Sequence, residues 1–474
     1  METAGCTDGD YARRAKVPVS DALLTGRQGR SRVVLLESVP FVSPSVSMNT
    51  PDASAWGPRL GPSAFLPSNG ASGGGDGAPP LLRPGRVGLV HDWLPVYAGA
   101  ERVLEQMIRV FPEPALYSLI DFIPEEQRGF LQGRPVETSF IQRLPFAKRL
   151  YRHYLPFAPL AVEQFDLTDH DVVISSSYAV AKGVLTRADQ LHISYVHSPV
   201  RYAWDLYHEY LEEGMSGGLR RAAARLVLHY LRLYDVTTAP RVDLFVANSQ
   251  NVARRIWKTY RRRAHVVYPP VDVDRFTVKT QKESFYLTMS RLVPYKRIDL
   301  IVKAFAAMPE KELVVIGEGP EHDALARLAG PNIRLLGYQP DDAVTYYMQN
   351  ARAFVFAAEE DFGIVPVEAQ ACGTPVIAYE RGGALETVVP GTTGVFFAEQ
   401  TVDHLTAAVN EFEHIRSQLD PADMRAQAER FAAPVFRRQF SELVERAYAE
   451  FVDGGVVDEC SQASLSPSGI SPSV

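Results

Sequence analysis

Residues 353–371 read AFVFAAEEDFGIVPVEAQA, an apolar run followed by an acidic turn and a second apolar segment. Residues 353–357 have the length and apolar character of a buried strand. We expect a helix to begin at Pro366, because proline fits the first helical position, where its missing N–H would have no partner. A strand that leads through a short turn into a helix is the repeating unit of a parallel α/β sheet.

The same alternation extends in both directions from this stretch. Short apolar runs that end in polar residues alternate with segments of helical periodicity. The predicted strands are 87–90, 115–120, 171–175, 192–197 and 243–248 in the first half, and 285–290, 312–316, 332–336, 353–357 and 375–378 in the second. This pattern predicts an α/β protein with two facing Rossmann-like, doubly wound domains and a ligand-binding cleft between them.

Composition divides the chain into successive segments. Residues 1–85 contain Gly-, Ser- and Pro-rich runs without periodicity, which predicts a disordered N-terminal extension. An N-terminal domain at 86–268 is followed by a linker at 269–283, because Pro269 and Pro270 stop regular structure. The second domain is expected at 284–433, a final helix at 434–452, and a disordered Ser-rich tail at 453–474.

Composition also excludes several classes of protein. The net charge of −7 argues against a nucleic-acid partner. Cys6, Cys372 and Cys460 are scattered and odd in number, which excludes a disulfide scaffold and fits a reducing compartment. Because no run of about 18 apolar residues occurs and the N-terminus does not resemble a secretory signal, we expect a cytoplasmic protein.

Two carboxylates mark the turn in the opening stretch. Glu360 lies between the strand and the helix, and Glu368 is expected in the first helical turn. Gly363 lets the backbone approach a ligand closely, and amides at a helix N-terminus attract oxygen-rich groups. Together these groups suit a polyol, whose hydroxyls donate to carboxylates. The alternative is that both acids only stabilise the start of the helix.

A basic loop lies at the equivalent place after the strand at 285–290. It reads SRLVPYKR over 290–297 and carries Arg291 and Lys296. A forked guanidinium and a compact ammonium suit a diphosphate, and an anion there would explain cations near a helix N-terminus. The alternative is a solvated basic turn, which we expect for Arg297.

A glycine turn, a histidine at a strand end and a DxD string are three further candidate features. Gly317, in the turn VIGEGP at 315–320, lacks the third glycine of a dinucleotide fingerprint, so the turn indicates the wall of a nucleotide pocket rather than an NAD or FAD site. His197 ends the strand at 192–197, where it could be structural or functional. Asp272 and Asp274 form a DxD string, but its position in the linker predicts no metal site there.

These motifs, in this order, resemble the retaining glycosyltransferases of family 4, which have the GT-B architecture. The matching strings in residues 284–397 are S-R-L-V-P-Y-K-R, V-I-G-E-G-P, E-D-F-G-I-V-P-V-E, G-T-P-V-I-A and G-G-A-L-E-T-V. The first half adds V-H-D-W-L-P-V-Y-A-G-A-E-R-V-L, V-I-S-S-S-Y-A-V-A-K-G-V and Y-V-H-S-P-V-R-Y-A-W-D, which resemble O-antigen and exopolysaccharide mannosyltransferases. The resemblance covers about residues 86–451.

The resemblance implies roles for individual residues. Arg291 and Lys296 would bind the donor diphosphate, Glu360 and His197 would contact the donor sugar, and Glu368 would hold the ribose. The implied catalytic set is Arg291, Lys296, Glu360 and His197, and the implied donor-binding set is Glu368, Phe362, Gly363, Ile364, Gly317 and Gly99. The final helix would cross back onto the N-terminal domain.

The resemblance also implies an activity. It is the transfer of a hexose, first of all mannose from GDP-mannose, to a glycan or lipid-linked glycan with retention, in cell-surface polysaccharide synthesis. No cofactor and no metal are expected. The alternatives are a UDP-hexose-dependent transferase, a nucleotide-sugar epimerase, or a non-catalytic nucleotide-sugar-binding partner.

Basic stretches suggest two kinds of surface. Residues 140–157 and 219–234 combine arginine or lysine with apolar residues and contain no acid, which suits an amphipathic helix on anionic lipid at the inner face of the plasma membrane. The alternative is an ordinary helix with one core face and one solvated face. The cluster around Arg254 and Arg255 is interpreted as a solvated helix face.

Overall fold

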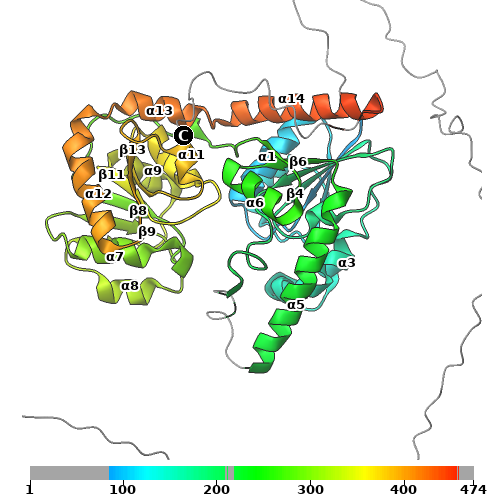
Figure 1. Ribbon diagram of the computed structural model, residues 1–474, viewed down its shortest axis with the longest axis horizontal. Coiled ribbons are helices and arrows are strands. Elements are labelled where there is room, and N and C mark those ends of the chain that lie inside the picture. The colour runs from blue at the N-terminus through cyan, green and yellow to red at the C-terminus, as the bar shows by residue number, and fades with distance from the viewer. Residues whose placement is uncertain (1–84, 209–210, 212–217, 456, 458–474) are drawn as a thin grey trace, which may run out of the picture. The chain divides into compact units, whose positions relative to one another are not determined.

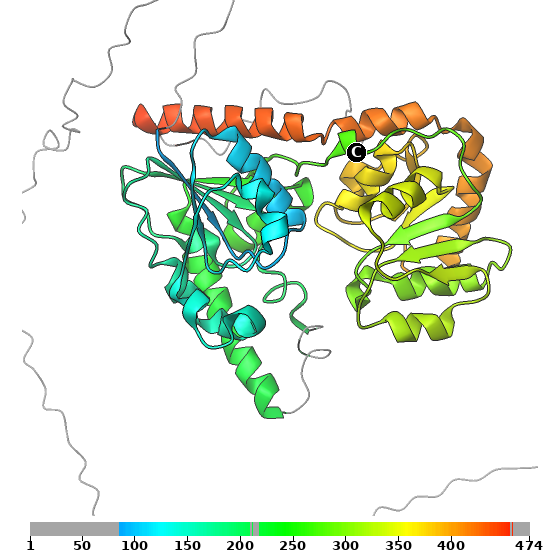
Figure 2. The same cartoon turned by 180° about the vertical axis from the view of Figure 1, so that it is seen from behind.

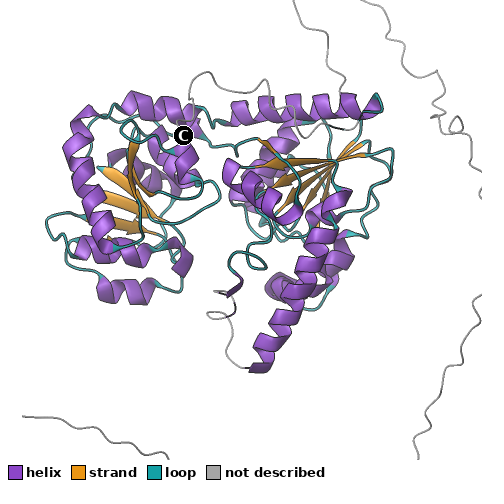
Figure 3. Cartoon of the chain, viewed as in Figure 1, coloured by secondary structure: helices purple, strands orange, loops and turns teal. Residues whose placement is uncertain are grey.

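The computed structural model describes residues 85–208, 211, 218–455 and 457. The disorder predicted for residues 1–85 and 453–474 lies outside these described residues, except at 85, 453–455 and 457. The described chain forms two sheets, each built of parallel strands and covered by helices (Figures 1 and 3). This arrangement confirms the α/β class and the two Rossmann-like domains.

The first sheet has seven strands in the order β3-β2-β1-β4-β5-β6-β7. The strands are β1 (Val87–His91), β2 (Ala115–Ser118), β3 (Val136–Thr138), β4 (Val172–Ser177), β5 (Leu191–Val196), β6 (Leu244–Ala247) and β7 (His265–Val266). The helices of this part are α1 (Gly99–Val110), α2 (Ala147–Leu150), α3 (Ala158–Val162), α5 (Gly218–Thr237) and α6 (Gln250–Tyr260).

The second sheet has six strands in the order β10-β9-β8-β11-β12-β13. The strands are β8 (Tyr286–Met289), β9 (Leu313–Ile316), β10 (Ile333–Leu335), β11 (Ala353–Phe356), β12 (Val376–Tyr379) and β13 (Gly394–Phe397). The helices are α7 (Ile298–Ala306), α8 (His322–Leu328), α9 (Asp341–Asn350), α10 (Ile364–Ala371), α11 (Ala384–Thr387), α12 (Val402–Ile415), α13 (Pro421–Glu429) and α14 (Ala433–Val452). Both sheets therefore reverse their winding direction beside the central strand, where doubly wound proteins bind ligands.

Alternate residues of each central strand enter separate cores on the two faces of the sheet. In β11, Val355 joins one apolar cluster, whereas Phe354 and Phe356 join another. In β1, Leu89 likewise joins the apolar cluster on one face of the sheet, and Val90 joins the cluster on the other face. Because both faces are covered, these strands are apolar throughout and do not alternate with polar residues.

Helix α14 belongs to the second half of the sequence but packs on the first sheet, beside α1 (Figures 1 and 2). Its Phe436 and Phe440 are stacked, with ring centroids 5.4 Å apart, and both rings contact Tyr195 of β5. The two chain segments that pass between the domains run side by side, since the amide of Val271 donates to the carbonyl of Phe431 at 2.8 Å.

The structure corrects three expectations about individual elements. Helix α10 begins at Ile364 rather than at Pro366, because Gly363 adopts a left-handed backbone (φ +87°) and turns the chain into the helix earlier. Proline is tolerated as the third helical residue, where its missing N–H would still lack a partner. Glu368 is consequently the fifth residue of the helix, not part of its first turn. The stretch 140–157 is a series of short turns around α2, not one amphipathic helix.

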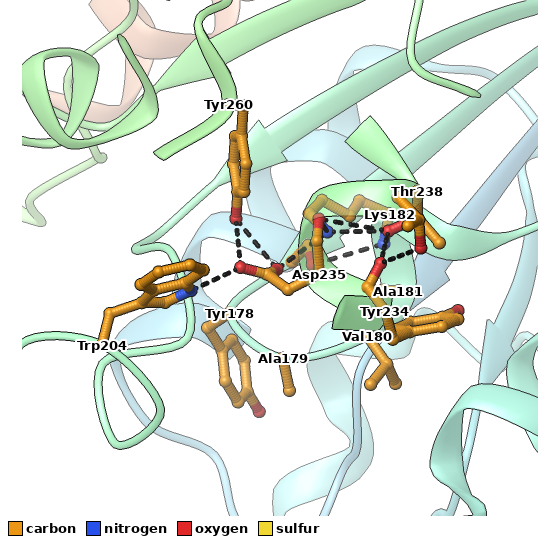
Figure 4. Close-up of polar contacts among 12 residues, drawn as sticks. Tyr178, Ala179, Val180, Ala181, Lys182, Trp204, Tyr234, Asp235, Thr238 and Tyr260 are labelled. Atoms are coloured by element: carbon orange, nitrogen blue, oxygen red, sulfur yellow. Dashed lines mark hydrogen bonds and ion pairs between the residues drawn. The ribbon is translucent and has the colours of Figure 1, made fainter. Parts of the chain in front are cut away.

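A buried ion pair ties α5 to the loop after β4 (Figure 4). The ammonium of Lys182, which is 1% exposed, contacts the Asp235 carboxylate at 2.8 Å and the Thr238 hydroxyl at 2.9 Å. Asp235 also accepts hydrogen bonds from the Trp204 indole at 2.8 Å and the Tyr260 hydroxyl at 2.9 Å. Both charges are therefore fully partnered, as burial requires.

Removing one member of this pair should destabilise the protein. We expect Lys182→Met to lower the free energy of unfolding by about 3–5 kcal/mol, because Asp235 becomes a buried carboxylate without a counterion. Lys303→Met is the matched control, since the pair of Lys303 with Asp299 is exposed to solvent and should be worth about 1 kcal/mol or less. Urea unfolding of the three proteins measures the difference; equal midpoints for the two variants would contradict the prediction.

Candidate active site

A cavity of about 780 Å³ lies at the carboxyl ends of strands from both sheets. It is lined by Arg291, Lys296, Glu360, His197, Phe362, Gly363, Ile364 and Gly99. The remaining predicted site residues, Glu368 and Gly317, line a second cavity of about 330 Å³. The two cavities adjoin, because Met289, Ser290 and Arg291 line both. The structure thus brings the predicted residues together, while their roles remain predictions.

Lys296 and Glu360 form an ion pair between loops that follow neighbouring strands. Lys296 ends a short helical turn after β8, and Glu360 follows β11. Burial, together with a smaller effect of the Arg201 charge, lowers the pKa of Lys296 to about 8. Arg291, on the same loop as Lys296, is exposed at the junction of the two cavities. A ligand diphosphate would therefore meet both cations.

Glycines hold the Glu360 loop by backbone contact with the turn after β12. The amide of Gly383 donates to the carbonyl of Glu360 at 2.8 Å. A Cβ atom at Gly383 would lie 2.3 Å from Cα of Phe362, and one at Gly382 would lie 2.3 Å from the carbonyl oxygen of Glu360. Any side chain at these two positions would displace the loop that carries the carboxylate.

Gly317 has the same function for the Arg291 loop. Its backbone is in a conformation that favours glycine (φ +137°), and an added Cβ would lie 1.8 Å from the carbonyl oxygen of Ser290. The amide of Leu292 also donates to the carbonyl of Glu318 at 2.8 Å. The turn at Gly317 therefore lines the smaller cavity and also fixes the position of Arg291. That this cavity holds a nucleotide stays a prediction.

Glu368 pairs with a residue that the sequence analysis missed. The guanidinium of Arg102, in the first turn of α1, donates to Glu368 at 2.9 Å across the two domains. Burial raises the pKa of Glu368, and Arg102 opposes this effect. Gly99, at the start of α1, faces the same side: a Cβ there would lie 3.4 Å from the Ile364 side chain. The position of Arg102 one helical turn after Gly99 was the available signal.

Asp361 and Glu386 connect the second domain to α6. Asp361 contacts the guanidinium of Arg255 at 2.8 Å and that of Arg201 at 3.6 Å. Glu386 accepts hydrogen bonds from the first amides of α6, those of Gln250 at 2.7 Å and of the next residue at 2.9 Å. A carboxylate is favourable at a helix N-terminus. The interpretation of Arg255 as part of a solvated face is therefore wrong, because an acid of the other domain covers it.

His197 lies in the cavity wall as a neutral imidazole. Burial lowers its pKa to about 3, with a smaller contribution from His91. Its Nε2 atom lies 2.8 Å from the hydroxyl of Ser176. A base this weak is poorly matched to proton abstraction near neutral pH, so the site favours a polar contact by His197 over general-base catalysis.

Two acids are used structurally. Asp92 accepts hydrogen bonds from four consecutive backbone amides, at residues 178–181, over distances of 2.6 to 2.8 Å. Asp274 lies in the linker, 3.7 Å from Arg425 and outside both cavities. In the part of the chain that the structure describes, no group of three or more His, Cys, Asp or Glu side chains could hold a metal ion.

Two protein-family models match the region that contains the site. The model described as Glycosyltransferase Family 4 matches residues 97–275, and the model described as Glycosyl transferases group 1 matches residues 272–431. Together they span residues 97–431, which is well over half of the chain. The fold and the matched models define a GT-B protein. The chain belongs to the family 4 glycosyltransferases.

Curated relatives match part of the chain. A GDP-mannose-dependent monoacylated alpha-(1-6)-phosphatidylinositol monomannoside mannosyltransferase from Corynebacterium glutamicum is 34% identical over 201 residues, which are 36% of this chain and 52% of the relative. A D-inositol 3-phosphate glycosyltransferase from Mycobacterium leprae is 30% identical over 225 residues, 42% of this chain and 51% of the relative. The chain thus spans about half the length of the curated relatives it matches.

Solved structures share the fold. Anabaena Alr3699/HepE in complex with UDP and glucose superimposes with a TM-score of 0.56 at 20% identity, over 75% of this chain and 98% of that chain. Sucrose-phosphate synthase from Thermosynechococcus elongatus gives a TM-score of 0.58 at 15% identity, over 77% and 99%. At such low sequence identity, these similarities show only that the two-domain fold is shared.

The lowered pKa of Lys296 predicts pH-dependent binding of a nucleoside diphosphate. The ammonium is charged below its pKa of about 8 and loses its charge as the pH rises through that value. We therefore expect the affinity for GDP to fall above pH 8, by at most about tenfold per pH unit for one proton. Lys296→Arg, whose guanidinium stays charged, should remove the fall. Calorimetric titration measures it, and a wild-type affinity that is flat over this range would contradict the prediction.

Proposed function

We propose that this protein is a metal-independent glycosyltransferase that transfers a hexose from a nucleoside-diphosphate sugar to a glycan or lipid-linked glycan, with retention of configuration. The observation that carries the proposal is the shared lining of one cavity by Arg291, Lys296 and Glu360, with Glu368 in the adjoining cavity. In one bound donor molecule, the two cations then face the diphosphate, Glu360 faces the sugar and Glu368 faces the ribose.

The reaction needs no protein nucleophile in this proposal. The bond between the anomeric carbon and the diphosphate oxygen breaks, and the acceptor hydroxyl forms the new bond on the same face. The departing phosphate oxygen takes the hydroxyl proton. Arg291 and Lys296 stabilise the negative charge that develops on the diphosphate, and amides at the start of α10 together with Glu360 orient the sugar. No cofactor is required, because the positive charge comes from side chains.

Removing either cation should slow turnover without unfolding the protein. We expect Arg291→Ala and Lys296→Ala each to lower kcat by about 10²–10³-fold, the cost of losing one preorganised donor to a developing charge. Lys303→Ala is the control, since Lys303 is an exposed lysine of α7 that lines neither cavity. The assay follows sugar transfer to a lipid-extract acceptor.

The same assay separates the alternatives. Near-normal turnover in both folded variants would overturn the diphosphate assignment. Sugar conversion without an acceptor would indicate an epimerase, and donor binding without any transfer would indicate a non-catalytic partner.

We infer that the donor is GDP-mannose. The inference rests on the resemblance to mannosyltransferases and on relatives whose names specify GDP-mannose; a UDP-hexose is the alternative. We expect GDP to bind at least tenfold more tightly than UDP in a direct titration at neutral pH. Tighter binding of UDP would reassign the donor.

We further propose that α5 rests on an anionic membrane surface that presents a lipid-linked acceptor on the cytoplasmic face. Leu219, Leu226 and Leu233 are 86%, 72% and 53% exposed, and their spacing places them on one stripe of the helix. Residues 224, 228 and 231, on the opposite stripe, are buried. Arg220 and Arg225 are exposed beside the apolar stripe, a combination that suits anionic lipid. Among the described helices, none has the length and apolar character to cross a bilayer.

Vesicle flotation tests this contact. We expect the full chain to float with phosphatidylcholine–phosphatidylglycerol vesicles and not with phosphatidylcholine alone. Arg225→Glu with Leu226→Glu should abolish flotation, because it reverses one charge and adds a carboxylate to the apolar stripe. The matched control is Arg327→Glu with Leu328→Glu on α8, an exposed Arg-Leu pair of the second domain. Equal flotation of the two variants would contradict the proposal.

A further inference from the structure

Four side chains form a continuous hydrogen-bonded chain that joins Glu101 to His197, both of which line the larger cavity. The Glu101 carboxylate lies 3.4 Å from Nε2 of His91, Nδ1 of His91 lies 3.0 Å from the Ser176 hydroxyl, and that hydroxyl lies 2.8 Å from Nε2 of His197. His91, Glu101 and Ser176 are each less than 5% exposed. The middle of the chain therefore lies in the protein interior, between α1 and the end of β5.

The sheet itself creates this alignment. His91 ends β1 and is paired in register with Ser176 of β4, and His197 directly follows β5 on the other side of β4. Glu101 is held in place because its second oxygen accepts the amide of Ala98 at 3.0 Å, beside the loop that enters α1. Three neighbouring parallel strands and one helix start thus fix the four groups.

The direction of each hydrogen bond follows from the end at Glu101. A carboxylate only accepts, so Nε2 of His91 carries a proton. In the neutral imidazole only one ring nitrogen carries a proton, so a neutral His91 that donates from Nε2 has a bare Nδ1 facing Ser176. The Ser176 hydroxyl then donates to His91, and its oxygen accepts from Nε2–H of His197. A neutral His197 with a proton on Nε2 has none on Nδ1.

His197 cannot easily rotate out of this arrangement. Its ring makes edge contacts with those of Tyr195, Tyr178 and His91, at centroid separations of 5.2, 5.8 and 6.4 Å. Its backbone amide donates to the carbonyl of Ser177 at 2.9 Å. Among the described residues, Nδ1 of His197 has no hydrogen-bond partner, and His197 lines the cavity.

We propose that Glu101, His91 and Ser176 are positioning residues that fix the tautomer of His197, so that its bare Nδ1 accepts a hydrogen bond from a hydroxyl of the transferred sugar. The tautomer stands on the contacts above, whereas the identity of the donated group rests on the proposed function. A site that can only accept at this point selects a sugar with a free hydroxyl there and discriminates against the deoxy analogue.

The tautomer can be read without any substrate. In protein labelled with ¹⁵N at histidine, with His197→Gln used for assignment, we expect two-bond proton–nitrogen correlations to show His197 protonated at Nε2. Ser176→Ala should change this pattern, because Nε2–H loses its acceptor. The matched control is Ser175→Ala on the same strand, whose hydroxyl contacts His192 at 3.0 Å instead. A proton on Nδ1 of wild-type His197, or an unchanged spectrum in Ser176→Ala, would overturn the proposal.

Kinetics separate positioning from general structural damage. We expect Ser176→Ala to lower kcat/KM for the nucleotide sugar by about tenfold, the value of one hydrogen bond, with the affinity for GDP unchanged. In a His197→Ala background the same substitution should have no further effect. An additive loss in the double variant would refute action through His197. If the spectra agree and no nucleotide sugar is turned over, the proposed function fails while the tautomer assignment stands.

Discussion

Backbone-to-backbone contact between neighbouring loops is the constraint on which the site depends. The loops after β8, β9, β11 and β12 meet at one edge of the second sheet, and each close approach occurs at a glycine. Gly317 packs on Ser290, and Gly383 packs on Phe362, at distances that leave no room for a side chain. These contacts fix where the long side chains of Arg291 and Lys296 begin, so that flexible cations are anchored on a rigid frame.

Charged contacts join the two domains, beside the ring contact of Tyr268 with Phe362. Arg102 with Glu368, Arg255 with Asp361, and Glu386 with the first amides of α6 all join one domain to the other. Asp361 is next to Glu360 in the loop after β11, and Glu368 lies in α10, the helix that follows this loop. The relative position of the domains is therefore coupled to the segment that carries the candidate sugar-binding carboxylate.

The sequence predicted the fold class because parallel strands buried on both faces are short apolar runs that stand out between helices. It also allowed the grouping of Arg291 and Glu360 to be anticipated, since β8 and β11 are neighbours and their carboxyl ends share one edge. Strands β3, β7 and β13 were missed, the first because it has only three residues, one of them Glu137. The other two were missed for similar reasons. Strand β7 has only two residues, and β13 begins at Gly394, which weakens the apolar pattern.

The position of Arg102 one helical turn after Gly99 indicated that it could face the site, but its pairing with Glu368 depends on how the two domains face each other, which the sequence does not show. The start of α10 was misplaced for a more local reason: the left-handed conformation of Gly363 determines it, and Pro366 does not. The chain of Glu101, His91, Ser176 and His197 was also out of reach, since only strand order and register place these residues in a row.

The return of α14 to the first sheet has a consequence for biosynthesis. Phe111 and Tyr195 are translated long before Phe436 and Phe440, the aromatic rings that cover them. While the ribosome is still producing the second domain, the first one has an incomplete core with an open aromatic face. The nascent chain must therefore stay soluble with that aromatic surface uncovered, or be shielded from aggregation, until α14 has emerged from the ribosome.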